Sequence, residues 1–336
     1  MMAPALTVPT TERNLTGARI AVFTIVTPDL AASIDFYTRF MNYALAERGV
    51  LPPGTIVEEA DLSGRAYAIL RHDGAVQGQL RFVEAAQGAR PNRPRPGSHA
   101  WDRGFGAIEC MTRDIEESYQ QMVRAGVETL SPPAYYFYRD MRRLNGSTLY
   151  PKSLDTLTYV PVGPAGELIY ISVVLPDNFG LPFPHLHSAC HNCFVVHPSR
   201  APVLDFYNAV FGLLPIAEYT GTLSCQRAIN RLLGESEDSL LWAGGMGDDF
   251  GMEFMEWTPA QGHETQFLPQ SLARTGHAMV TIAVNDLAAV ARRIEAAGLA
   301  PLAARPLPMV GQALPAGILL RGASGELVEV VERSVL

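Results

Sequence analysis

The chain has 336 residues, 48% of them hydrophobic, and a formal net charge of −8 at pH 7. This length allows two medium-sized cores, no apolar run approaches the roughly 20 residues of a membrane span, and the first residues lack the layout of a secretion signal. The negative charge is spread along the chain and four cysteines are too few for a disulfide scaffold, so we expect a soluble, cytoplasmic protein without a membrane or nucleic-acid partner.

A strand followed by a helix is predicted near the start of the chain. An alternating apolar run, IAVFTIV, begins at Ile20 and passes through Thr27-Pro28-Asp29-Leu30 into AASIDFYTRFM, where apolar residues recur at helical spacing. The same order returns at VLDFYNAVFGL, where Asp205-Phe206-Tyr207 repeats Asp35-Phe36-Tyr37. Two copies about 170 residues apart predict a chain built from two similar halves.

Each half contains a second, variant copy of this unit. Both variant copies have an alternating strand, an aspartate suited to cap a helix (Asp114, Asp286) and an Ala-Gly pair suited to end it. Their last strands also match, as GELIYISVV from Gly166 and GELVEVVE from Gly325. In chain order the units are therefore A, which begins near Ile20, B, which contains Asp114, A′, which contains Asp205, and B′, which contains Asp286.

Short strand-like runs separate these landmarks, so that each helix is followed by several strands. We predict an α+β fold of four βαβββ modules. Two proline-rich stretches are interpreted as connectors between modules and between halves. They place an N-terminal domain at residues 18–175 and a C-terminal domain at residues 188–336.

This pattern resembles the vicinal oxygen chelate superfamily, which includes glyoxalases, bleomycin resistance proteins and extradiol dioxygenases. The resemblance rests on Pro28-Asp29-Leu30 with Phe36-Tyr37, Phe206-Tyr207 with Phe211-Gly212-Leu213, Asn285-Asp286-Leu287 and the two GEL strands. It implies that pairs of modules join their sheets into an incompletely closed barrel around a cleft, giving two tandem half-barrel domains. We interpret the aromatic residues as helix-to-sheet packing rather than as ligand contacts.

The resemblance also implies a divalent metal (Fe, Mn, Zn or Ni), held by His or Glu on the first strand of each module and by Glu on the last strand. In the N-terminal half, Ala21, Val22 and Ala107 stand near the first-strand positions, with Phe82 and Tyr170 at the last-strand positions, so we expect no metal there. The C-terminal half offers His191, His277 and Glu329 as candidate ligands, and we expect the active site in that half.

Two features of the sequence leave this ligand set open. Counting from the helices places Asn192 and Met279, rather than the two histidines, at the first-strand positions. In the alternative interpretation, the histidines are satisfied by hydrogen bonds at strand ends, and Glu329 pairs with an arginine. The Cys190-x-x-Cys193 pair has zinc-ligand spacing, but residues three apart in an extended strand point to opposite faces.

Three functions therefore remain open. The first is a metal-dependent enzyme, of dioxygenase, isomerase or lyase type, acting on a small aromatic or oxygen-chelating substrate. The second is a metal-free protein that binds and sequesters a small molecule in the same cleft. The third is a metal-independent enzyme that uses Glu253, Tyr170 or Glu109 as acid or base. A homodimer is expected from the resemblance alone.

Overall fold

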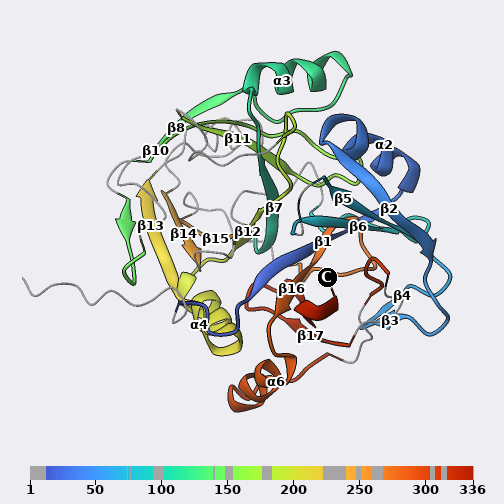
Figure 1. Cartoon of the computed structure of the whole chain (residues 1–336), viewed down its shortest axis with the longest axis vertical. Helices are drawn as coiled ribbons and strands as arrows, with labels where there is room; N and C mark the ends of the chain where they lie inside the picture. Colours follow the sequence, from blue (N-terminus) through green and yellow to red (C-terminus); the bar gives the residue numbers. More distant parts are fainter. Residues whose placement is uncertain are drawn as a thin grey trace, which may run out of the picture.

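The computed structural model describes residues 13–73, 75, 77–93, 102–138, 141–147, 154–175, 184–221, 240–246, 251–258, 268–302, 307–311 and 316–335. Two large sheets lie side by side and each curls strongly (Figure 1). Four helices accompany them among the described residues, and the combination confirms the predicted α+β class. None of the helices in the described part of the chain is long and apolar enough to cross a membrane.

The first sheet has seven described strands. In spatial order they are β17 (Gly317–Arg321), β18 (Leu327–Glu332), β16 (Gly276–Val284), β1 (Arg19–Thr27), β6 (Gln79–Glu84), β5 (Ala66–His72) and β2 (Tyr43–Val50). A separate two-stranded ribbon follows β2 and consists of β3 (Ile56–Val57) and β4 (Ala60–Asp61).

The second sheet has nine described strands. In spatial order they are β8 (Ala134–Tyr138), β10 (Leu154–Tyr159), β11 (Ile169–Leu175), β7 (Gly104–Met111), β12 (Asn192–Val196), β15 (Met252–Thr258), β14 (Leu240–Met246), β13 (Pro215–Gly221) and β9 (Arg142–Arg143). The chain ends in a short 3₁₀ turn, η2 (Arg333–Val335).

Each of the four modules begins with a strand and a helix. The helices are α2 (Leu30–Phe40), α3 (Ile115–Arg124), α4 (Arg200–Phe211) and α6 (Leu287–Ala296). The side chains of Asp29, Asp114 and Asp286 each accept a hydrogen bond from a backbone N–H in the first helical turn, as the sequence predicted. The N-cap of α4, Ser199, makes no such side-chain bond. At its other end α4 is capped by Gly212, whose φ of 66° is a left-handed conformation that glycine adopts without strain.

The sheets do not follow the two halves of the sequence. In the first sheet β1 of module A pairs with β16 of module B′, and in the second sheet β7 of module B pairs with β12 of module A′. Each sheet therefore takes one module from residues 18–175 and one from residues 188–336, whereas we expected each half to form its own barrel. Because all four modules present similar first strands, local pattern does not select the partner, and only the assembled contacts do so.

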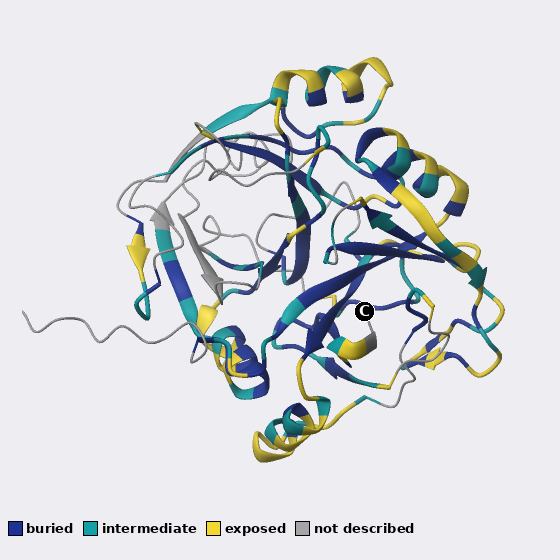
Figure 2. Cartoon of the chain, viewed as in Figure 1, coloured by how far each residue is buried: buried dark blue, intermediate teal, exposed yellow. Residues whose placement is uncertain are grey.

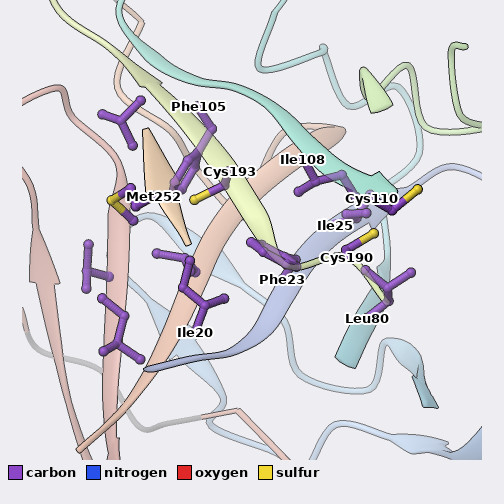
Figure 3. Packing of buried hydrophobic residues seen from close by; sticks show 14 of the residues in the cluster. Ile20, Phe23, Ile25, Leu80, Phe105, Ile108, Cys110, Cys190, Cys193 and Met252 are labelled. Carbon is purple, nitrogen blue, oxygen red and sulfur yellow. The ribbon is translucent and has the colours of Figure 1, made fainter. Parts of the chain in front are cut away.

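A shared core holds the two sheets together. Side chains from both sheets and from the segment before β12 meet in one cluster, including Phe23, Ile25, Ile108 and Cys193 (Figure 3). Figure 2 shows the strands at this junction as buried, while the outer faces of the helices are exposed. Cys110, Cys190 and Cys193 are free thiols in this core, and Cys225 lies outside the described residues.

Candidate active site

Four side chains occupy equivalent places in each sheet. Two of them stand on first strands, five residues before a helix N-cap, and the other two stand on last strands and pair with them in register. The first-sheet quartet is Thr24, Arg81, Thr281 and Glu329, and the second-sheet quartet is Glu109, Tyr170, Phe194 and Glu253. Because side chains alternate along a strand, the neighbours of each quartet residue point to the opposite face.

The first-sheet quartet is joined by a buried ion pair. Arg81 Nη2 lies 2.7 Å from Glu329 Oε2, and both side chains are at most 1% exposed. The Arg81 guanidinium also donates to the hydroxyl groups of Thr24 and Thr281, and the Thr281 hydroxyl donates to Glu329 at 2.6 Å. Every member of the quartet is therefore bonded within the set, and Glu329 pairs with an arginine as the alternative interpretation stated.

The structure does not bring the three predicted metal ligands together. The Glu329 carboxylate is occupied by Arg81 and Thr281. His277 Nε2 lies 3.2 Å from the carbonyl oxygen of Leu168, and burial lowers the pKa of this histidine to about 4. His191 is exposed and precedes β12. Across the described ranges, no three His, Cys, Asp or Glu side chains are grouped so that they could hold a metal ion.

The metal that the resemblance implies fits neither quartet. In the first sheet, a guanidinium, which has only N–H donors, stands at one of the four positions. In the second sheet, Phe194 offers no ligand atom, and Glu109 already accepts hydrogen bonds from two neighbours.

The second-sheet quartet places two carboxyl groups beside one amide. Glu109 accepts hydrogen bonds from the Ser172 hydroxyl at 2.7 Å and from Asn192 Nδ2 at 2.9 Å. The Asn192 side chain also adjoins Glu253 closely enough to lower the pKa of that carboxyl group. Asn192 is 5% exposed, whereas Glu109 and Glu253 are half-buried. The two carboxyl groups therefore lie beside the same amide and keep partial access to solvent.

This arrangement changes the protonation of Glu253. Burial, and then the nearby charge of Glu109, raise the pKa of Glu253 to about 8, while the bond from Asn192 opposes the shift. Near neutral pH Glu253 is therefore mostly a neutral carboxylic acid, which can donate a proton. A carboxylate that accepts hydrogen bonds beside a carboxylic acid is an arrangement suited to general acid–base chemistry.

Aromatic and apolar side chains adjoin the two carboxyl groups. The rings of Tyr170 and Phe194 meet edge to face with centroids 4.7 Å apart. Ala107 and Met255 belong to the same cluster, which lies on the quartet face of the sheet. The acid groups are therefore bordered by a buried apolar cluster of the kind that contacts the apolar part of a small organic molecule.

The structure brings together three residues that were predicted from the sequence. The predicted acid or base residues Glu109, Tyr170 and Glu253 all belong to the second-sheet quartet. Arg81 was missed, because Phe82 was assigned to the last-strand position. The structure instead packs Phe82 against Tyr37 of α2, with ring centroids 5.2 Å apart. The alternation of QLRFVE, with its arginine between two apolar residues, was the signal that could have found Arg81.

Comparison with known proteins supports the resemblance. The family model of the Glyoxalase/Bleomycin resistance protein/Dioxygenase superfamily matches residues 19–143. Residues 19–143 therefore carry the sequence signature of this superfamily. The match covers module A and most of module B as far as β9, and so includes one acid of the second-sheet quartet, Glu109. A search of curated proteins found no match to the sequence.

Solved structures share the fold over nearly the whole chain. Glyoxalase I from Zea mays superposes with a TM-score of 0.58 at 12% identity, covering 95% of this chain and 94% of that enzyme. A predicted dioxygenase from Bacillus subtilis gives a TM-score of 0.53 at 13% identity, covering 94% of this chain and 84% of that protein. Identities this low show a common fold and do not transfer a reaction.

Proposed function

We propose that this protein is a metal-independent enzyme of the superfamily that moves a proton on a small organic substrate at the second-sheet quartet. The observation that carries the proposal is the Glu109–Asn192–Glu253 arrangement, in which one amide donates to Glu109 and adjoins Glu253, whose pKa is raised to about 8. It involves residues of module B and module A′, which the sheet brings together from distant parts of the sequence.

The two carboxyl groups have different roles. Glu109, held by Ser172 and Asn192, is placed to take a proton from a carbon next to a carbonyl group. Glu253 is placed to donate its proton to the carbonyl oxygen as negative charge develops there. The substrate class is a carbonyl compound with an acidic C–H bond, and the reaction class is isomerisation or elimination. Tyr170 and Phe194 would contact the apolar part of such a compound.

No step is assigned to a metal. Members of the superfamily commonly use a divalent metal, but the donor sets of both quartets argue against one here. The dioxygenase alternative depends on a ligand set, His191, His277 and Glu329, that is dispersed in this structure.

A second candidate function is binding without turnover. It is supported by the apolar cluster of Tyr170, Phe194 and Met255 beside the acids. A sequestering protein would use these side chains for affinity and would not need the raised pKa of Glu253.

Deuterium exchange separates these two functions. A panel of small aldehydes, ketones and keto acids is incubated with the protein in D₂O, and incorporation of deuterium next to the carbonyl is followed by NMR. We expect exchange with at least one compound, and a roughly 10²- to 10⁴-fold loss in Glu253→Gln and in Glu109→Gln. Glu84→Gln, at the exposed end of β6, is the matched control.

The negative outcomes are distinct. A compound that shifts the melting temperature but exchanges no deuterium would favour the binding protein. Exchange that is unchanged in both Glu109→Gln and Glu253→Gln would contradict the proposed site.

A further inference from the structure

The Arg81 guanidinium is surrounded by oxygen atoms from four residues. Its nitrogen atoms donate to Thr24 Oγ1 at 2.9 and 3.1 Å, to Thr281 Oγ1 at 3.2 Å, to Glu329 Oε2 at 2.7 Å and to the carbonyl oxygen of Pro308 at 3.1 Å. Hydroxyl, carboxylate and backbone carbonyl oxygens are also the ligands preferred by hard divalent cations such as Mg²⁺, Ca²⁺ and Mn²⁺. The oxygen shell is therefore that of a cation site with a guanidinium at its centre.

The position of Arg81 is related by the symmetry of the sheet to the position of Glu329. Thr24 and Thr281 are equivalent residues of paired first strands, and each pairs with a last-strand residue, Arg81 or Glu329. The two modules therefore meet at one point with two hydroxyls, one anion and one cation. Replacing Arg81 by a second carboxylate would leave a symmetric set made only of oxygen ligands.

The segment from Leu307 to Met309 covers the ion pair. The backbone N–H of Leu307 donates to Glu329 Oε1 at 2.7 Å, and Pro308 accepts from Arg81. Leu307 and Met309 are at most 1% exposed and pack into the clusters on the quartet face of this sheet. No charged atom of the pair is therefore presented to solvent or to a ligand.

We infer that Arg81 is a built-in cation that takes the place of a divalent metal between the paired modules of the first sheet. The first sheet is thereby a closed, non-catalytic half, and the chain needs no metal to complete it. This inference does not depend on the reaction proposed for the second sheet, because it concerns a different quartet.

The cost of burying these charges makes the inference testable. A buried ion pair is stable only while both partners and their hydrogen bonds are present, and removing one partner leaves an uncompensated charge. A divalent cation could then compensate Glu329 in place of the guanidinium. In the intact protein the same cation has no vacant place.

The experiment measures the melting temperature of Arg81→Glu with and without Mn²⁺. Without metal, two buried carboxylates should lower the melting temperature by roughly 5–10 °C or more relative to the wild type. We expect millimolar Mn²⁺ to restore a large part of this loss, and native mass spectrometry to show one bound Mn²⁺. The wild type should show neither a shift nor a bound ion.

The matched control is Arg81→Met with Glu329→Met, which removes both charges and the only carboxylate of the oxygen shell. This double variant should fold and should not respond to Mn²⁺. If Arg81→Glu does not fold under any condition, Arg81→Gln provides the measurement, because it leaves Glu329 alone with the two threonines. The inference is overturned if Mn²⁺ stabilises neither single variant more than the double variant, or if the wild type binds one Mn²⁺ that Glu329→Gln loses.

Discussion

Tyr37 donates a hydrogen bond of 2.9 Å to Glu167 and so joins the helix of one sheet to the last-strand turn of the other. Tyr207 and Glu326 form the equivalent bond at 3.0 Å in the opposite direction between the sheets. Both glutamates are at most 2% exposed, and each also accepts a backbone N–H of its own turn. The repeated Asp-Phe-Tyr and Gly-Glu-Leu motifs of the sequence are thus the two ends of a doubled contact between the sheets.

Removing one tyrosine hydroxyl should weaken the contact between the sheets. Tyr37→Phe leaves the buried Glu167 carboxyl without one of its donors, and we expect a loss of about 1–3 kcal/mol in the free energy of unfolding. Urea unfolding followed by circular dichroism measures it. Tyr119→Phe, on the half-buried face of α3, should change stability by much less. Equal losses in the two variants would show that the hydroxyl of Tyr37 contributes nothing specific.

The two buried glutamates should make stability fall as the pH rises. Burial raises the pKa of Glu167 and of Glu326 from the ordinary 4.5 to about 7. The folded state therefore binds more protons than the unfolded state between these values, so their stabilising contribution is present below about pH 4.5 and is lost as the pH rises through 7. The change amounts to at most about 3 kcal/mol for each group.

Comparison with Glu167→Gln isolates this effect, because glutamine does not titrate. We expect the wild type to lose stability relative to Glu167→Gln between pH 5 and pH 8, as measured by urea midpoints. A difference that stays constant over this range would mean that Glu167 does not change its protonation.

The proposed reaction should lose rate at alkaline pH. Because Glu253 acts as the proton donor and its pKa is raised to about 8, kcat/KM should decline above that pH, approaching a tenfold fall for each further unit. Glu253→Gln should be slow, and its pH profile should lack this alkaline limb, the decline of kcat/KM with rising pH. A limb of the same position in Glu253→Gln would assign the titration to another group.

Asn192 should set the position of that limb. Its bond to Glu253 lowers the pKa of this acid, so Asn192→Ala should move the alkaline limb to higher pH. The pH profile is the informative measurement, since a merely structural role would lower the rate at every pH without moving the limb.

Metal analysis tests the ligand sets of both sheets together. Protein purified without a histidine tag should contain far less than one equivalent of Fe, Mn, Zn or Ni, and EDTA should leave deuterium exchange unchanged. A stoichiometric metal that disappears in Glu253→Gln would instead show that the second-sheet carboxylates are ligands.

The sequence alone determined the repeat, the helix caps and the fold class. These follow from periodicity and from local hydrogen bonds, as at Asp29, Asp114 and Asp286, where the capping side chain and its partner are three residues apart. It also placed Glu109, Tyr170 and Glu253 among the candidate acids and bases.

Only the tertiary structure decided which modules share a sheet and which polar residues meet. Arg81 and Glu329 are 248 residues apart, and no local pattern couples them. The modules are similar enough that any two could pair, so the pairing depends on the sum of many distant contacts. The same contacts placed an arginine beside Glu329, where a metal had been expected, and brought the two carboxyl groups together in the other sheet.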